Sequence, residues 1–177
     1  MDKLIIKGGS KISGTVNVHG SKNSALPIIV SSLLSKKTLK LSNVPNVVDV
    51  LNLIKLLKNY GVKIEHKKNK LKINPSKIKN LSADYDVVRK MRASILILGP
   101  LLSRFGEARI SLPGGCAIGT RPIDIHLAGL SKLGANFEIQ NGFVVGSVKS
   151  QLIGNKIKLP FPSVGATENI LMASVLA

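Results

Sequence analysis

The chain has 177 residues, 44% of them hydrophobic, which is enough to bury the core of one globular domain and too apolar for a disordered tail. Its longest apolar run, residues 93–102, contains Gly99 and Pro100 and is far shorter than the roughly 20 residues needed to cross a bilayer, so no membrane span is expected. The formal charge is +17, from 26 Lys and Arg against 9 Asp and Glu, so anionic partners have to be considered.

The cysteine count and the charge pattern bound the protein further. Cys116 stands alone and cannot form an intrachain disulfide, and residues 1–7 lack the apolar run of a secretory signal, so a reducing cytoplasm is the expected location. Aromatic residues make up only 3% of the chain, which leaves few side chains for base stacking. A solvated, lysine-rich surface is favoured, and an anion-binding or nucleic-acid-binding module is the alternative.

The opening of the chain predicts short strands followed by a helix. Residues 3–7 and 15–19 have the composition of two short strands with glycines between them. Residues 25–34 form an apolar run that predicts a helix, and this places Lys22 and Asn23 at a helix start. Free backbone N–H groups beside a lysine can bind an anion, and Asn23 can hydrogen-bond a polar substrate; ordinary helix capping is the alternative.

The next segment has the order strand, helix, strand, strand. The expected bounds are a strand at 38–43, an amphipathic helix at 47–59, and a hairpin of 62–65 and 71–73. A longer helix is expected at 84–105, kinked or divided at Gly99-Pro100, with Arg92 on its polar side as a candidate binding residue.

The same order then returns, which predicts an internal repeat. The expected bounds are a strand at 107–112, a helix at 122–133, and a hairpin of 136–139 and 143–148 that turns at Asn141-Gly142. A third unit opens at residue 156 and leads into a helix expected at 170–176. Because this unit is unfinished and its apolar helix has nothing to cover it, we expect the sequence to be part of a longer polypeptide.

A glycine-rich segment carries the cysteine. Residues 113–121 read Pro-Gly-Gly-Cys-Ala-Ile-Gly-Thr-Arg, so Cys116 lies among glycines near Arg121, directly before a predicted helix with Pro122 in its first turn. A guanidinium and a helix start both favour thiolate, which would let Cys116 act as a nucleophile or, once reprotonated, as a proton donor. The alternative is a small apolar residue buried under a loop.

Four spaced motifs together resemble the UDP-N-acetylglucosamine enolpyruvyl transferases. They are Ser-Lys-Asn-Ser-Ala-Leu-Pro at 21–27, Arg-Ala-Ser at 92–94, the cysteine segment within 112–124, and Ser-Val-Gly-Ala-Thr at 163–167. The resemblance implies an α/β fold, an inside-out α/β barrel built from repeated βαβαββ units and incomplete here, with the active site in a cleft between two domains.

The resemblance also implies how the chain is divided between these domains. Residues 1–20 would supply strands to a domain completed by a missing C-terminal half, in the same chain or in a second one. Residues 21–177 would form an incomplete transferase domain that carries the cysteine segment. The aspartate that serves as the base and several further arginines would lie in the missing half, so this chain alone is expected to be inactive.

The reaction implied is transfer of the enolpyruvyl group of phosphoenolpyruvate to the 3-hydroxyl of UDP-N-acetylglucosamine with release of phosphate, the first committed step of peptidoglycan synthesis, without a metal or cofactor. Lys22 and Arg121 would hold phosphoenolpyruvate, and Cys116 would protonate its methylene carbon and react with the epoxide antibiotic fosfomycin. The substrate-binding residues implied are Lys22, Asn23, Arg92, Arg121, Pro122, Ile123, Asp124, Ile125, Phe161, Pro162, Ser163 and Val164. The alternative within the fold is the sister transferase that acts on shikimate 3-phosphate and lacks the cysteine segment.

Overall fold

The computed structural model describes residues 3–78, 81, 92–112 and 123–177, and for residues 92 and 93 it describes the backbone. Two units with the same order of elements make up most of this part of the chain. The first contains β1 (Leu39–Leu41), α2 (Val48–Asn59), β2 (Lys63–Lys67) and β3 (Lys70–Asn74), and the second contains β4 (Glu107–Ser111), α5 (Asp124–Lys132), β5 (Ala135–Gln140) and β6 (Phe143–Val148).

The two sheets have equivalent topology. Their strand orders are β1-β3-β2 and β4-β6-β5, so in each unit the last strand lies in the middle and pairs antiparallel with both neighbours. The helix of each unit connects the two outer strands. The internal repeat predicted from the sequence is therefore confirmed.

Local turn chemistry sets the register of the second hairpin. Asn141 and Gly142 have φ of 50° and 78°, and two successive positive φ values give the tight turn whose twist matches that of the flanking strands. Strands β5 and β6 consequently pair from Gln140 opposite Phe143 to Ala135 opposite Val148. The hairpin and its turn lie where the sequence predicted them.

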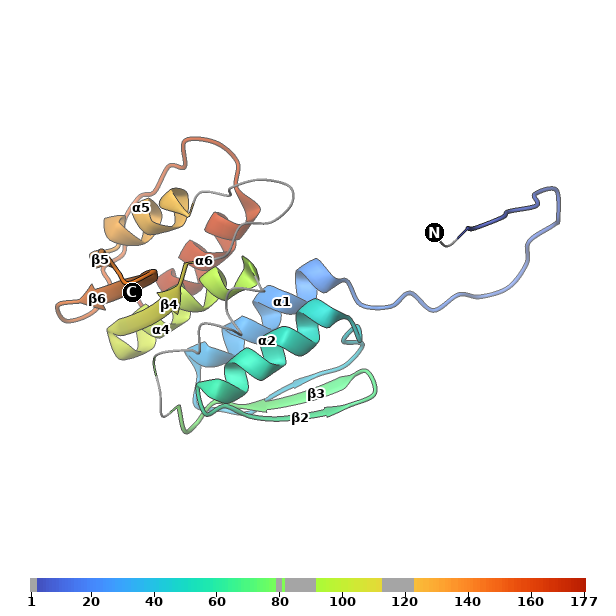
Figure 1. Ribbon diagram of the computed structural model, residues 1–177, viewed down its shortest axis with the longest axis horizontal. Coiled ribbons are helices and arrows are strands. Elements are labelled where there is room, and N and C mark those ends of the chain that lie inside the picture. Colours follow the sequence, from blue (N-terminus) through green and yellow to red (C-terminus); the bar gives the residue numbers. More distant parts are fainter. Residues whose placement is uncertain (1–2, 79–80, 82–91, 113–122) are drawn as a thin grey trace.

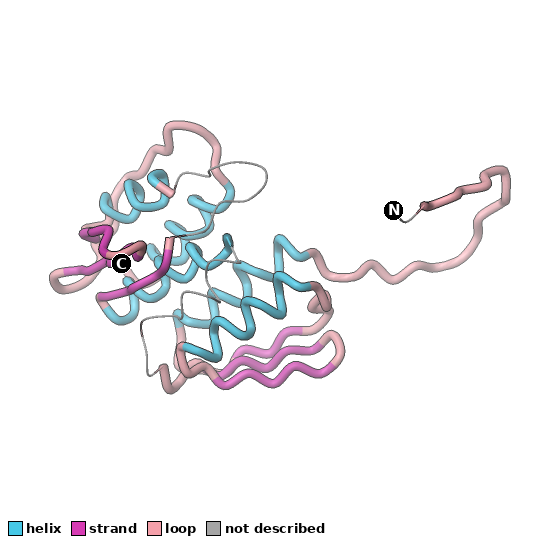
Figure 2. Tube along the Cα trace, viewed as in Figure 1, coloured by secondary structure: helices cyan, strands magenta, loops and turns pink. Residues whose placement is uncertain are grey.

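The remaining helices form the centre of the molecule. These are α1 (Lys22–Ser31) with the 3₁₀ helix η1 (Ser32–Leu34), the 3₁₀ helix η2 (Arg92–Ile97), α4 (Leu98–Phe105) and α6 (Val164–Ser174). Figure 2 shows these helices in the middle of the body and the two sheets on its outside. This arrangement, with helices inside and strands outside, is the one that the predicted fold class requires.

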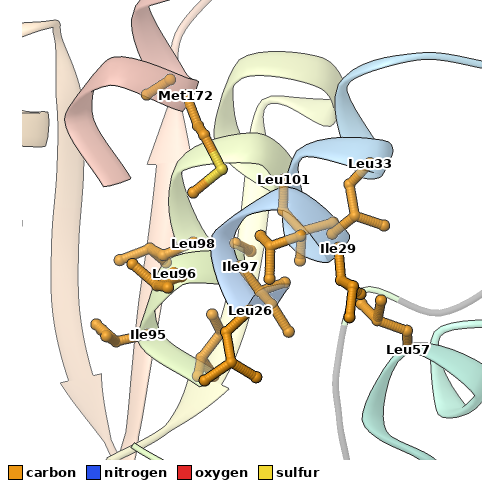
Figure 3. Packing of buried hydrophobic residues seen from close by; sticks show 14 of the residues in the cluster. Leu26, Ile29, Leu33, Leu57, Ile95, Leu96, Ile97, Leu98, Leu101 and Met172 are labelled. Atoms are coloured by element: carbon orange, nitrogen blue, oxygen red, sulfur yellow. The ribbon is translucent and has the colours of Figure 1, made fainter. Parts of the chain in front are cut away.

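Leucine and isoleucine side chains from both units meet in one core. Ile29 and Leu33 of the α1–η1 segment pack toward Leu57 of α2 and toward Ile97 and Leu101 at the centre of the chain (Figure 3). All five side chains are fully buried. Each such side chain contributes about 1.5–3 kcal/mol relative to an exposed one, so this shared core fixes the position of the helices relative to one another.

Two helix predictions can be compared directly with the structure. The long helix predicted to divide near Gly99-Pro100 does so at Leu98, where η2 passes into α4; Pro100 lies in the first turn of α4, where a missing N–H breaks no intrahelical bond. The predicted helix start at residue 170 is wrong, because α6 begins at Val164. Ser163 caps this start, and its hydroxyl oxygen accepts a hydrogen bond from the backbone N–H of Ala166 at 3.4 Å.

Residues 3–20 form an extended arm without regular secondary structure, and Figure 1 shows the arm leading away from the body. The strands predicted at 3–7 and 15–19 are therefore not formed in this structure. Their physical requirement is a neighbouring strand, and the apolar side chains of the arm, such as Ile6 and Val16, are exposed. Close to the body, the side-chain amide of Asn43 donates a hydrogen bond to the carbonyl oxygen of Val18 at 3.2 Å.

Candidate substrate site

The first turn of α1 presents a cation, an amide and free backbone N–H groups. Lys22 and Asn23 are the first two residues of this helix, and both are exposed. The first helical hydrogen bond runs from the N–H of Ala25 to the carbonyl oxygen of Ser21 at 2.9 Å, and the Ser21 side chain makes no capping bond. With no acidic residue in this turn, its positive end is suited to an anion, as predicted from the sequence.

Lys22 has an ion-pair partner that the sequence did not reveal. Its ammonium nitrogen lies 2.8 Å from a carboxylate oxygen of Asp49, which belongs to the first turn of the neighbouring helix α2. Both side chains are nearly half exposed, at 47% and 41%, so the pair is worth at most about 1 kcal/mol. An anionic ligand would therefore compete with Asp49 for Lys22 at little cost in stability.

The starts of α5 and α6 carry several of the predicted substrate-binding residues, and these two helices pack against each other. Gly129 permits their close approach, because a Cβ atom at this position would lie 2.2 Å from the Cδ1 atom of Ile170. Asp124 is exposed and Ile125 is buried in the first turn of α5. Both line a hollow of about 160 Å³ between α5 and residues 157–160.

The residues that precede α6 are mostly accessible. Phe161, Pro162 and Val164 are exposed, with 56% of Phe161 open to solvent, while Ser163 is partly buried by its capping role. The first turn of α6 contains no acidic residue, so its free N–H groups can donate hydrogen bonds to an anion. The first turn of α5 differs, because Asp124 already compensates its positive end.

The four helices that begin with predicted substrate residues pack against one another in a series. Helix α5 packs against α6, α6 against η2, and η2 against α1. Each begins with residues predicted to bind substrate: Asp124 in α5, Val164 in α6, Arg92 in η2 and Lys22 in α1. Of the other predicted site residues, Ile123 is the partly buried residue before α5, and Cys116, Arg121 and Pro122 lie outside the described residues.

Beneath this series lies a buried polar contact that the sequence analysis missed. The Nδ2 atom of Asn169 lies 3.2 Å from Nδ1 of His126, and both residues are buried. Burial lowers the pKa of His126, and the nearby carboxylate of Asp124 opposes this effect in part. The signal in the sequence was a histidine within the apolar run of the predicted helix 122–133, and its partner was hidden because α6 was expected to start too late.

A second charged surface lies on the outer face of sheet β1-β3-β2. A hollow of about 410 Å³ is lined there by four lysines, Lys40, Lys67, Lys70 and Lys72, and by Glu65. Lys72 pairs with Glu65 at 3.1 Å, with both side chains about half exposed or more. The surface contains none of the predicted substrate residues and has the solvated, lysine-rich character expected from the composition.

In the part of the chain that the structure describes, no helix is long and apolar enough to cross a membrane. Within the same residues, no group of three or more His, Cys, Asp or Glu side chains is placed to hold a metal ion.

A central layer of helices and two outer sheets with the same topology define an enolpyruvyl transferase fold. Residues 6–177 match the family described as EPSP synthase (3-phosphoshikimate 1-carboxyvinyltransferase), and the chain belongs to this family. Among solved structures, the enolpyruvyl transferase NikO from Streptomyces tendae has a TM-score of 0.74 and 20% identity over 96% of this chain and 39% of its own. An EPSP synthase from Acinetobacter baumannii has a TM-score of 0.72 and 20% identity over 93% of this chain and 38% of its own.

Curated relatives are much more similar in sequence. A UDP-N-acetylglucosamine 1-carboxyvinyltransferase from Campylobacter fetus is 52% identical over 177 residues, which are 100% of this chain and 42% of the relative. A UDP-N-acetylglucosamine 1-carboxyvinyltransferase 1 from Halalkalibacterium halodurans is 49% identical over 178 residues, 100% of this chain and 40% of the relative. The chain thus spans about two fifths of the length of these relatives.

Proposed function

We propose that this chain is the N-terminal part of an enzyme that transfers the enolpyruvyl group of phosphoenolpyruvate to the 3-hydroxyl of UDP-N-acetylglucosamine and releases phosphate. The observation that carries the proposal is the 52% identity of all 177 residues of this chain to a UDP-N-acetylglucosamine 1-carboxyvinyltransferase. The reaction places the enzyme in the cytoplasm at the first committed step of peptidoglycan synthesis, and it uses no metal or cofactor.

Helix α1 supplies the first part of the phosphoenolpyruvate site in this proposal. Lys22 leaves Asp49 and binds the phosphate or carboxylate of phosphoenolpyruvate, assisted by the free N–H groups of the same turn. Asn23 hydrogen-bonds the sugar. The support for these roles is the exposure of both side chains at an uncapped helix start and the weakness of the Lys22–Asp49 pair.

The nucleotide sugar binds along the starts of α5 and α6. The N–H groups at the start of α6, at Ser163 and Val164, face the anionic diphosphate, and Asp124 acts as an acceptor for neutral donors of the ligand rather than for phosphate. Phe161 has an exposed ring that can stack on the uracil. Arg121, Pro122, Ile123, Ile125 and Pro162 complete this part of the proposed site.

The chemistry is an addition followed by an elimination. Cys116 gives a proton to the methylene carbon of phosphoenolpyruvate while the sugar hydroxyl adds to the neighbouring carbon, and loss of phosphate with a proton then restores the double bond. Arg121 and Lys22 hold the charge that develops on phosphoenolpyruvate, and Arg92 lies near the substrate. The same thiol opens the epoxide of fosfomycin.

The proposed division into domains accounts for the exposed arm. Residues 1–20 supply strands to a second domain formed by the remaining part of the polypeptide, and residues 21–177 build the domain described above. Apolar side chains such as Ile5 and Val18 would then be covered by that second domain. A second domain also supplies the base for the sugar hydroxyl, so the 177-residue chain alone should release no phosphate.

The proposal is tested on the complete polypeptide with three acceptor conditions: UDP-N-acetylglucosamine, shikimate 3-phosphate and no acceptor. We expect phosphate to be released from phosphoenolpyruvate only when the nucleotide sugar is the acceptor. The Lys22→Ala variant should not release phosphate. The family also contains 3-phosphoshikimate 1-carboxyvinyltransferases, so release only with shikimate 3-phosphate would replace the proposed acceptor. If no phosphate is released with either acceptor and the protein binds DNA with a strong dependence on salt, the lysine-rich binding module would be favoured instead.

A further inference from the structure

The side chain of Asn169 joins three segments of the chain through its carboxamide group. Its Oδ1 atom accepts a hydrogen bond from the N–H of Gly99 at 2.9 Å, and its Nδ2 atom donates to the carbonyl oxygen of Ile95 at 2.9 Å. Nδ2 also lies 3.2 Å from Nδ1 of His126. Asn169 is fully buried and His126 is 9% exposed, so these contacts are shielded from water.

These contacts assign the proton of the histidine ring. The amide orientation is fixed, because Oδ1 faces an N–H donor and Nδ2 faces a carbonyl acceptor. The second hydrogen of Nδ2 is then directed at Nδ1 of His126, which has to present a lone pair. The ring is therefore neutral and carries its proton on Nε2, in agreement with the lowering of its pKa by burial.

The segments joined in this way are the ones that carry the predicted substrate residues. Asn169 belongs to α6, which begins at Val164; His126 belongs to the first turn of α5; and Ile95 and Gly99 lie where η2 passes into α4. The packing around the amide is close, because a Cβ atom on Gly99 would lie 2.5 Å from both oxygens of Asn169. The ring of His126 also contacts the start of α6, where a Cβ atom on Gly165 would lie 3.4 Å from its Cε1 atom.

We propose that the His126–Asn169 hydrogen bond is a positioning contact that holds the starts of α5 and α6 at the spacing required by the nucleotide sugar. The proposal rests on the function proposed above and adds two residues that lie beneath the substrate-binding ones. Because the contact acts on the spacing of the binding residues, its loss changes the affinity for UDP-N-acetylglucosamine more than the rate of the bound complex.

Two substitutions at His126 separate positioning from packing. His126→Leu removes the acceptor and keeps an apolar side chain, whereas His126→Asn keeps an acceptor near the position of Nδ1. In the complete polypeptide, we expect His126→Leu to raise the KM for UDP-N-acetylglucosamine about tenfold, which corresponds to about 1.4 kcal/mol, with kcat changed less than about threefold. His126→Asn should restore KM to within about threefold of the unchanged protein.

Binding of UDP-N-acetylglucosamine measured by calorimetry should show the same loss and the same restoration, and thermal unfolding checks that both variants fold. If His126→Leu does not fold, His126→Gln replaces it, because its carbonyl oxygen lies near the position of Nε2 rather than Nδ1. Unchanged KM and affinity in the variant without the acceptor, or an equal loss in His126→Asn, would overturn the positioning role while the proposed function stands. Absence of turnover in the unchanged protein would overturn both.

Discussion

Arg104 connects α4 to η1 and to the end of the first unit, and its substitution offers a direct test of how these segments are held together. This residue lies near the end of α4, which leads into β4 of the second unit. Its Nη1 atom donates to the carbonyl oxygens of Leu33 at 2.7 Å and Ser35 at 3.0 Å, and its Nη2 atom donates to that of Pro75 at 3.2 Å. One guanidinium therefore joins α4 to the end of η1 and to the chain just after β3.

The expected cost of Arg104→Ala is about 2–3 kcal/mol. A hydrogen bond from a charged donor contributes about 1.5–3 kcal/mol when it is shielded, but the contact to Ser35 is exposed and water will replace part of the three. Arg104→Lys should lower the free energy of unfolding by roughly half as much. Lysine keeps a charged donor, but its ammonium group cannot reproduce the planar fork that reaches three carbonyl groups.

Urea denaturation followed by circular dichroism measures this difference as a shift of the unfolding midpoint at constant slope. Arg109→Ala is the matched control, because Arg109 is exposed and its guanidinium lies 4.4 Å above the ring of Phe143, a contact worth about 0.5–1 kcal/mol. A loss in Arg104→Ala no greater than the loss in Arg109→Ala would refute the role given to the three carbonyl contacts.

Three further predictions concern single side chains. Among the described residues the buried hydroxyl of Tyr60 has no hydrogen-bond partner, and burial raises its pKa, so Tyr60→Phe should leave thermal stability unchanged or raise it by up to about 1 kcal/mol; a loss above 1 kcal/mol would reveal a partner. Burial lowers the pKa of His126 below its value in the unfolded chain, so the unfolded chain binds more protons and stability falls as pH drops below about 6.5. His126→Asn should make the urea midpoint less dependent on pH in this range, and an identical dependence would contradict the neutral ring. Asp49→Asn should cost less than about 1 kcal/mol in stability, because its pair with Lys22 is half exposed, and should leave activity measurable where Lys22→Ala abolishes it; equal loss of activity in both would show that Lys22 needs its partner.

Features set by neighbouring residues were predictable from the sequence. The hairpin turning at Asn141-Gly142 was predicted because both residues accept positive φ. Helix α2 was predicted because its apolar residues follow the helical period, and Lys22 and Asn23 were correctly placed at the start of α1.

Features that depend on distant residues were missed. Asn169 contacts residues 43 to 74 positions away, and no local pattern encodes those contacts.

The late start predicted for α6 has a local cause. Gly165 and Thr167 have weak helix propensity, but the helix cap at Ser163 outweighs this effect. The strands predicted in residues 3–20 failed for another reason, since strand composition gives no strand without a neighbour to pair with.

In the function proposed above, this chain supplies the reactive thiol of a transferase site, and covalent modification of Cys116 is the test of that role. The complete polypeptide is incubated with fosfomycin in the presence of UDP-N-acetylglucosamine, and its peptides are mapped by mass spectrometry. We expect a single adduct on the peptide that contains Cys116 and no adduct in Cys116→Ser. An unmodified Cys116 in folded protein would contradict it and would favour a cysteine that serves only as a buried apolar residue.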